Sequence, residues 1–364
     1  MTLPKILVTT AAGKTGFPTA LQLLEKGYPV RAFIHRRNAI STQLEEAGAE
    51  LFIGDMADMA TLHQAMAGIQ RAYFCPPPAP NMLFYGVSFA VAAQSAQLEV
   101  VVAMSQWLSH PQHPAYATRE TWLMDTILPW MPNVDTVKIN PGWFADNYML
   151  VLEPIAQLGL MPMPLGQGLN PPPSNEDIAR VIVGALTNPA PHIGKIYRPT
   201  GPTVLSPDEI AATYAKVLQR PVKYRDISET LFLKAVKFQG FTEFMQSQLR
   251  FYAEEYRRNA FGIGGATNAV LEVGGSQPED FETITRRYVT QRSSARRSVS
   301  NKLRAMWNFT QILLTPASDL DTYEQSQHHP NVTDAAYAPD FSPWINSHAS
   351  EGAFGVKSPG MSLR

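Results

Sequence analysis

The sequence predicts an α/β fold in which a doubly wound parallel sheet is followed by a smaller, discontinuous C-terminal lobe. Over roughly the first 140 residues, short β-branched runs alternate with stretches of helical spacing, which is the pattern of stacked βαβ units. The run VVVAM at 100–104 is continuously apolar, as in a parallel strand covered on both faces. A turn with two glycines, VTTAAGKTG, joins the first apolar run to the first helical stretch.

The first part of the chain divides into strands and the helices between them. Short apolar and β-branched runs place strands at 5–10, 29–35, 50–53, 71–75, 100–104 and 134–139. Apolar residues at helical spacing place helices at 16–26, 40–47, 59–66, 83–97 and 119–128. Gly27 is expected to end the first of these helices, and Asp58 is expected to cap the third.

Beyond Pro141 this alternation stops. The segment 154–174 is rich in proline and glycine and is expected to be irregular. Ser174 and Ser206 each stand three residues before an acid, which predicts an N-cap at each position. The helices expected in this part run over 175–186, 207–218 and, as a longer region, 228–259.

The stretch from Thr283 to Ser318 contains no acid, while arginine and lysine supply seven positive charges. Its apolar residues Val299, Leu303, Met306 and Leu313 share one face of a helix. We expect this helix to dock on its own domain with the arginines in solvent; contact with a polyanion or a membrane surface is the alternative. From Asp319 onward the sequence turns acidic and is expected to be loop-like.

Composition excludes several classes of protein. The chain of 364 residues has 30 basic and 31 acidic side chains, a balance that argues against a nucleic-acid partner. Its single cysteine, Cys75, cannot form an internal disulfide and fits a reducing compartment. No apolar run approaches the roughly 18 residues of a membrane span, and the first apolar run is too short for a signal peptide. A cytoplasmic location is therefore expected.

The glycine turn is the first candidate binding feature. Its spacing is Thr10-x-x-Gly13-x-x-Gly16, with Lys14 and Thr15 before the helix. At such a junction the helix N-terminus offers unpaired backbone N–H groups, and glycine lets the backbone approach a pyrophosphate. The sequence therefore predicts a dinucleotide-binding turn of the Rossmann type, although a plain strand-to-helix turn is the alternative.

The ends of the next strands indicate which dinucleotide binds. The second strand ends in His35, Arg36 and Arg37, where folds that prefer NAD carry an acid, and no acid follows until Glu45. Two guanidinium groups suit a 2′-phosphate, so we predict NADPH, with Arg36 as the main contact; a solvated basic turn is the alternative. Further contacts are expected from the ends of the third and fourth strands, namely Asp55 and Met56 near the adenine and Pro76 near the nicotinamide ribose.

Taken together, these segments resemble the NmrA-like branch of the atypical short-chain dehydrogenases. The resemblance rests on VTTAAGKTG, VRAFIHRR, GDMAD, the segment NPGWFADN at 140–147 and the segment 175–211, and it covers about residues 1–225. It implies an NADP(H)-binding Rossmann domain and a smaller lobe that closes a substrate cleft. In this family Gly13 to Gly16 match the phosphate loop, whereas Thr10 replaces a glycine. Four residues after the sixth strand are implied beside the nicotinamide: Asn140, Pro141, Gly142 and Trp143.

Short-chain dehydrogenases generally use a tyrosine as the acid, with a lysine four residues later. Here Ser105, a further catalytic candidate, ends the fifth strand and Tyr116 follows 11 residues later, but the position four residues beyond Tyr116 is Glu120. A carboxylate there would raise the tyrosine pKa, so Tyr116 is either a proton donor or a hydroxyl that only lines the cleft. His113 is a second candidate donor. His110 and His113 have no adjacent acidic partner, and no metal site is expected.

The remaining expectations concern packing and organisation. Cys75 is expected to be an apolar filler, and an aromatic pocket could be lined by Trp107, Trp122, Trp143, Phe144 and Tyr148. We expect an NADP(H)-binding domain over 1–150 with a returning segment at about 175–200, a substrate lobe over 151–290 and a C-terminal extension over 291–364.

The leading hypothesis is an NADPH-dependent oxidoreductase that reduces a small aromatic, quinone or enone-type molecule. One alternative is a catalytically inactive, NADP(H)-sensing regulatory protein. The other is a non-redox isomerase or cyclase on the same scaffold. The sequence leaves the substrate and the oligomeric state open.

Overall fold

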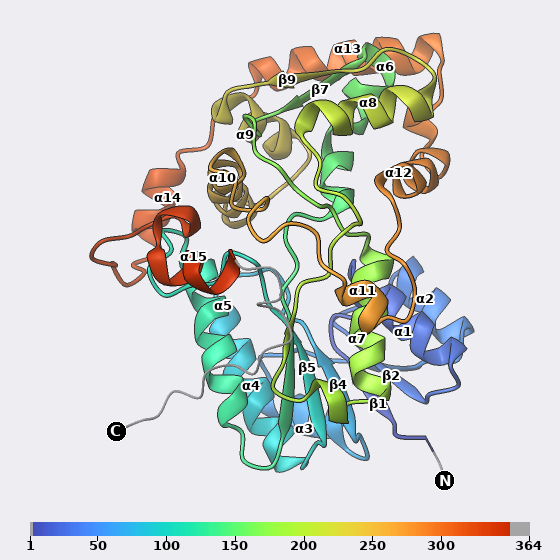
Figure 1. Ribbon diagram of the computed structural model, residues 1–364, viewed down its shortest axis with the longest axis vertical. Helices are drawn as coiled ribbons and strands as arrows, with labels where there is room; N and C mark the ends of the chain where they lie inside the picture. The colour runs from blue at the N-terminus through green and yellow to red at the C-terminus, as the bar shows by residue number, and fades with distance from the viewer. Residues whose placement is uncertain (1–2, 350–364) are drawn as a thin grey trace.

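The computed structural model describes residues 3–349 of the chain. Figure 1 shows a sheet with its helices at one end of the molecule and a lobe built mainly of helices at the other. The sheet has seven parallel strands in the order β3-β2-β1-β4-β5-β6-β8. They are β1 (Ile6–Val8), β2 (Val30–Ile34), β3 (Glu50–Ile53), β4 (Arg71–Phe74), β5 (Val100–Met104), β6 (Asp135–Ile139) and β8 (Ile196–Tyr197). The predicted fold class is confirmed.

The strand order reverses beside β1, which pairs with β2 on one side and β4 on the other. Ile6 is in register with Val30 of β2 and with Arg71 of β4. In open α/β sheets, ligands bind at the carboxyl ends of the strands where the order reverses. The β1–β4 junction is therefore the place to look for a dinucleotide site.

Helices cover both faces of the sheet. On one face α1 (Gly16–Glu25), α2 (Ala39–Glu46) and α7 (Asn175–Thr187) form a core with the strands, in which Leu23 and Ile182 are buried. On the other face α3 (Met59–Met66), α4 (Met82–Ser95) and α5 (Tyr116–Ile127) form a second core, in which Phe89 and Met124 are buried. This double coverage explains the continuously apolar β5.

Local capping signals place several helix starts as predicted. The Asp58 carboxylate accepts from the Ala60 backbone N–H, and the Ser174 hydroxyl accepts from the Asp177 N–H. Ser206 forms a capping box with Glu209 at the start of α8 (Pro207–Leu218). Helix α5, however, begins at residue 116 rather than 119.

The lobe has its own core and a two-stranded parallel sheet, β7 (Leu160–Met163) with β9 (Lys223–Asp226). The expectation of an irregular segment over 154–174 is wrong for its first part, because it contains most of α6 (Leu152–Leu158) and all of β7. Burial of Ile155 and Ala156 stabilises that helix, and pairing with the distant β9 defines that strand. The local content of proline and glycine predicts neither the burial that stabilises α6 nor the pairing of β7 with β9.

The region expected to be one long helical stretch is two helices, α9 (Glu229–Phe238) and α10 (Glu243–Arg257). They are separated at Gly240, which has a φ of +86°. Further along lie α11 (Ala269–Glu272) and α12 (Phe281–Thr290). Short 3-10 turns complete this part of the chain, η1 (Leu128–Trp130), η2 (Ala145–Val151), η3 (Ala190–His192) and η4 (Ser293–Ala295).

The C-terminal part contains α13 (Val299–Leu314), α14 (Leu320–Ser326), η5 (Ala338–Asp340) and α15 (Ser342–His348). The loop-like expectation after Asp319 is therefore wrong for two helices; Asp319 caps α14 and Trp344 of α15 is buried. Helix α13 docks on its own lobe against α6 and α9, as expected, but its apolar face is exposed rather than turned inward. Among the described helices, none combines the length and apolar character needed to cross a membrane.

Candidate active site

The glycine turn lies between β1 and α1, at the point where the strand order reverses. Thr10 has a φ of +49°, in the left-handed region where the family carries glycine. Its hydroxyl donates to the Cys75 carbonyl at 2.5 Å, and its own carbonyl accepts from the Gly13 N–H at 2.8 Å. These two bonds hold a non-glycine residue in a conformation that glycine would adopt freely.

The two glycines are required by the closeness of the turn. A Cβ on Gly13 would lie 2.9 Å from the Thr10 carbonyl oxygen, and a Cβ on Gly16 would overlap that same oxygen more severely. The first turn of α1 has no side-chain cap, because the Thr15 hydroxyl pairs with the Tyr73 hydroxyl at 2.8 Å instead. The helix therefore keeps backbone N–H groups for an anion, which fits a dinucleotide phosphate.

Cys75 lies at the end of β4 beside the turn. Its backbone N–H donates to the Thr9 hydroxyl at 2.8 Å, which ties β4 to β1. Burial raises the pKa of the Cys75 thiol to about 11, so it stays protonated at neutral pH. This agrees with its expected role as an apolar filler.

Lys14 connects the turn to the segment after β6. Its ammonium group pairs with the Asp146 carboxylate at 2.8 Å and donates to the Asn147 side chain at 3.2 Å. The Lys14 side chain is more than half exposed. The turn and the start of η2 are thus held together at the carboxyl edge of the sheet.

The two arginines after β2 have different surroundings. Arg37 makes a two-pronged ion pair with Glu45, at 2.6 and 2.9 Å. Arg36 and His35 are exposed, and within residues 3–349 Arg36 has no ion-pair partner. Of the two guanidinium groups, that of Arg36 is the one available to an anionic ligand.

The other predicted cofactor contacts lie at the ends of neighbouring strands. Asp55 is exposed and accepts from the Ala57 N–H at 2.9 Å, Met56 is buried, and Pro76 is half-buried. After β6, Asn140 is buried with its side-chain oxygen unpartnered among the described residues. Because the strands are parallel and adjacent, these ends meet at one edge of the sheet.

The rest of the segment after β6 turns toward the lobe. The Pro141 carbonyl accepts from the Trp107 N–H at 3.0 Å, and Gly142 has Phe261 and Arg198 beside its Cα. Trp143 packs in the lobe core, 5.7 Å from the Tyr256 ring. Trp143 is thus largely a core residue rather than a free surface for a ligand.

Ser105 directly follows β5, and its side chain is fixed by a hydrogen bond. Its hydroxyl donates to the Asp125 carboxylate at 2.7 Å, which also accepts from Ser109 at 3.1 Å and pairs with Lys138 at 3.4 Å. A hydroxyl held in this way positions the loop after β5. Its predicted catalytic role stays a prediction.

Tyr116 is the first residue of α5 and is half-buried. Its ring stacks on His329 of the C-terminal extension, with centroids 3.7 Å apart. Its pKa is raised, first by burial and then by the charge of Glu120, while Arg119 opposes the shift. Tyr116 therefore stays protonated at neutral pH.

A cavity of ≈ 690 Å³ opens beside Tyr116. It is lined by Ala57, Asn81, Leu83, Phe84, Tyr85, Val87, Tyr116 and Glu120. Phe84 and Tyr85 were not anticipated, whereas the expected pocket residues Trp107, Trp143 and Tyr148 are buried in the core. The abundance of aromatic residues in the sequence indicated an aromatic pocket. Only the tertiary packing shows which aromatic side chains fill the core and which line a cavity.

His113 is completely buried. Its Nδ1 accepts from the Ala115 N–H at 2.9 Å, so its Nε2 carries the proton and donates to Glu255 at 2.9 Å. Burial lowers the pKa of His113 to about 3 and raises that of Glu255 to about 8, so both are neutral near pH 7. In this arrangement His113 has no open path to a substrate, and its role as a proton donor stays a prediction.

Glu255 is a partner that the sequence reasoning missed, because it lies 142 positions away from His113. With His110 these two side chains place one nitrogen or oxygen each within 4.8 Å of one another. The residues next to His110 and His113 in the sequence give no indication that Glu255 lies beside them. The expectation of no metal site stays a prediction.

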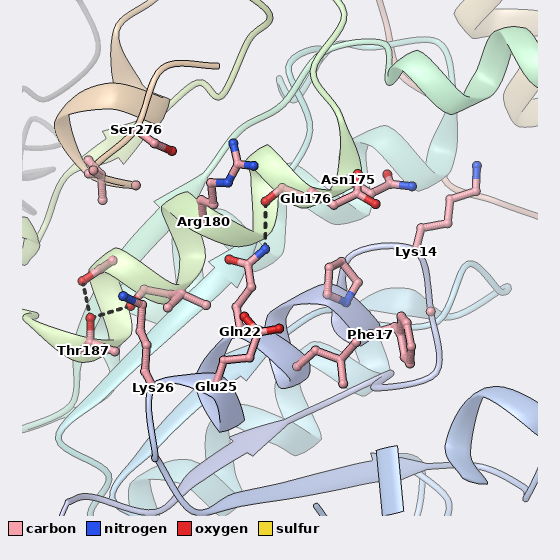
Figure 2. A pocket seen from close by; sticks show the side chains of 18 of the residues that line it. Lys14, Phe17, Gln22, Glu25, Lys26, Asn175, Glu176, Arg180, Thr187 and Ser276 are labelled. Atoms are coloured by element: carbon pink, nitrogen blue, oxygen red, sulfur yellow. Dashed lines mark hydrogen bonds between the residues drawn. The ribbon is translucent and has the colours of Figure 1, made fainter. Parts of the chain in front are cut away.

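A larger cavity, ≈ 1150 Å³, lies elsewhere. Figure 2 shows it along the flanks of α1 and α7, where the Gln22 side chain donates to the Glu176 carbonyl at 3.1 Å. It touches the glycine turn only through Ala12, Gly13 and Lys14. Since it runs along the helices rather than across the strand ends, it is not the expected place for a dinucleotide.

Residues 3–111, which include the glycine turn and the ends of the first five strands, match the NmrA-like family. Among curated relatives of this chain, an NAD(P)H azoreductase from Xenophilus azovorans is 29% identical over 226 residues, covering 60% of this chain and 76% of that enzyme. A (4-alkanoyl-5-oxo-2,5-dihydrofuran-3-yl)methyl phosphate reductase from Streptomyces griseus is 26% identical over 230 residues, covering 61% and 77%.

Solved structures support the Rossmann-like α/β fold. An NADPH-dependent quinone oxidoreductase from Escherichia coli, complexed with NADPH, superposes with a TM-score of 0.66 at 19% identity, covering 78% of this chain and 99% of that one. At this identity the likeness establishes the fold alone. The curated relatives are oxidoreductases, so a reductase that uses NAD(P)H on a small molecule is the general activity they support.

Proposed function

We propose that this protein is an NADPH-dependent reductase of a small aromatic, quinone or enone-type molecule. The observation that carries the proposal is the cavity beside Tyr116, which Phe84 and Tyr85 also line. Its lining comes from the loop after β3, from the start of α4 and from α5. Reduction of an azo compound and of a quinone by the relatives named above supports the same class of substrate.

The described residues fit NADPH. The glycine turn and the uncapped first turn of α1 would hold the pyrophosphate, and Arg36 would hold the 2′-phosphate. NADPH, when bound, supplies a hydride. The task left to the protein is to orient the substrate in the cavity, exclude water and provide a proton.

Tyr116 is the proposed proton donor. Burial and Glu120 keep its hydroxyl protonated at neutral pH, which suits a group that gives a proton to a developing oxyanion. Arg119, whose guanidinium lies 5.4 Å from the Tyr116 ring, would supply the nearby positive charge that a lysine generally provides in short-chain dehydrogenases. The single cysteine, a half-buried thiol that stays protonated at neutral pH, supports a cytoplasmic location.

The test measures NADPH oxidation with a naphthoquinone, an azo dye and an enone, using the full chain. We expect turnover with at least one of them, and a loss of about 100-fold in kcat for Tyr116→Phe. Tyr323→Phe, a half-buried tyrosine outside the cavity, is the matched control and should leave kcat unchanged. Binding of NADPH without oxidation in the presence of any acceptor would contradict the proposal.

One observation favours a second candidate, a cofactor-sensing regulatory protein. The C-terminal extension covers the segment around Tyr116: His329 stacks on its ring, and the Pro330 carbonyl accepts from Arg119 at 2.9 Å. A sensor needs no open route to Tyr116. Partner capture that depends on the redox state of NADP(H), without turnover, would favour this candidate.

A further inference from the structure

Helix α13 is docked with its apolar side outward. Large apolar residues on this side have exposed fractions of 78% for Val299, 60% for Leu303, 64% for Trp307 and 72% for Leu314, and Met306 and Leu313 are about half exposed. Their spacing of three, four and seven residues places them on one face. We call these six residues the outer face of α13.

The inner side of α13 is small and polar. Ala305 is the one buried residue of the helix. The Asn308 side chain and the Arg304 guanidinium donate to the two Glu153 carboxylate oxygens, at 2.8 and 3.0 Å. Lys234 donates to the Leu313 carbonyl at 3.1 Å, near the C-terminal end of the helix. Polar bonds thus hold the helix to the lobe, and its outward orientation follows from them.

The surroundings of the outer face are cationic. From Thr283 to Ser318 there is no carboxylate side chain. Four of the cations here, Arg292, Arg296, Arg297 and Lys302, are exposed and have no ion-pair partner within residues 3–349. A protein normally covers an apolar face of this size or leaves it for a partner.

We propose that the outer face of α13 and these four cations, which we call the cationic border, form a docking surface for an anionic lipid membrane. The apolar side chains would enter the boundary between headgroups and acyl chains, with the Trp307 ring at headgroup level. The cationic border would contact the anionic headgroups. The protein would then lie on the membrane without crossing it.

Charge favours an anionic membrane over a second copy of the chain as the partner of the outer face of α13. If two copies paired through their outer faces about a two-fold axis, each cationic border would face α13 of the other copy. That helix belongs to the stretch from Thr283 to Ser318, which has no carboxylate to balance the positive charge. An anionic lipid surface supplies that balance. The observations therefore favour lipid over self-association.

The location of α13 leaves the candidate active site free. Figure 1 places α13 on the side of the lobe that is turned away from the sheet. A molecule docked through α13 would keep the carboxyl edge of its sheet accessible to cofactor and substrate. The docking surface does not depend on the proposed reductase activity.

Vesicle flotation of the full chain tests the proposal, with phosphatidylcholine vesicles and with vesicles that also contain phosphatidylglycerol. We expect binding to the anionic vesicles, weakened by added salt, and little binding to the neutral ones. Arg296→Ala/Arg297→Ala should weaken the apparent affinity about 30-fold. Lys223→Ala/Arg225→Ala, a pair of exposed cations on β9, is the control and should change the affinity less than about threefold.

A second pair of variants tests the apolar part. Leu303→Ser/Trp307→Ser should abolish flotation, whereas Leu123→Ser/Trp130→Ser, which alters exposed residues of α5 and η1, should not. Flotation that is absent, or that both pairs reduce equally, would overturn the proposal. So would a concentration-dependent dimer that Leu303→Ser/Trp307→Ser converts to a monomer while vesicles capture no wild-type protein, because the face would then be a contact between copies.

Discussion

Replacing Arg36 by alanine should change the affinity for NADPH but not the affinity for NADH. Arg36 is exposed and has no ion-pair partner in the described part of the chain, so its removal breaks no ion pair there. A hydrogen bond to a charged group contributes about 1.5–3 kcal/mol, and exposure puts this one at the lower end. We therefore expect Arg36→Ala to weaken NADPH binding about 10-fold and to leave NADH binding unchanged.

The assay is a titration of both cofactors by calorimetry at low and physiological salt. The matched control is Arg37→Ala/Glu45→Ala, which removes the neighbouring ion pair without changing the net charge. This control should keep the wild-type preference. If Arg36→Ala leaves the ratio of the NADPH and NADH dissociation constants unchanged, the assignment of the 2′-phosphate contact is refuted.

Three further predictions concern the glycine turn and the buried cluster. Gly16→Ala places a methyl group against the Thr10 carbonyl and should weaken NADPH binding more than 10-fold by calorimetry. Gly68→Ala, at a position with open space but a φ of +72°, should lower stability and still leave NADPH binding normal. The pKa of both His110 and His113 is lowered to about 3, so stability present above pH 6.5 should be lost as pH falls toward 3; His110→Phe should reduce that loss in urea titrations. The pKa of Glu255 is raised to about 8, so the folded protein holds a proton that the unfolded chain releases above about pH 4.5. Stability should therefore fall between about pH 4.5 and 8, and Glu255→Gln should flatten that slope; an unchanged slope would show that the carboxyl is not protonated in the folded protein.

The sequence determined the features that depend on neighbours along the chain. The caps at Asp58, Ser174 and Ser206 follow from side chains that bond to N–H groups two or three positions away. The alternation of strands and helices follows from apolar periodicity, and it carries the glycine turn to the end of β1. For this reason the fold class and the composition of the candidate cofactor edge could be predicted before any contact was known.

Tertiary structure decided everything that joins distant segments. It paired β7 with β9, set Glu255 against His113 and stacked His329 on Tyr116, although the partners are separated by many tens of residues. It also turned the apolar side of α13 outward, because polar bonds to Glu153 fix the opposite side of that helix. Periodicity shows that a helix has two faces, but the face that packs is chosen by the free energy of contacts with residues elsewhere in the chain.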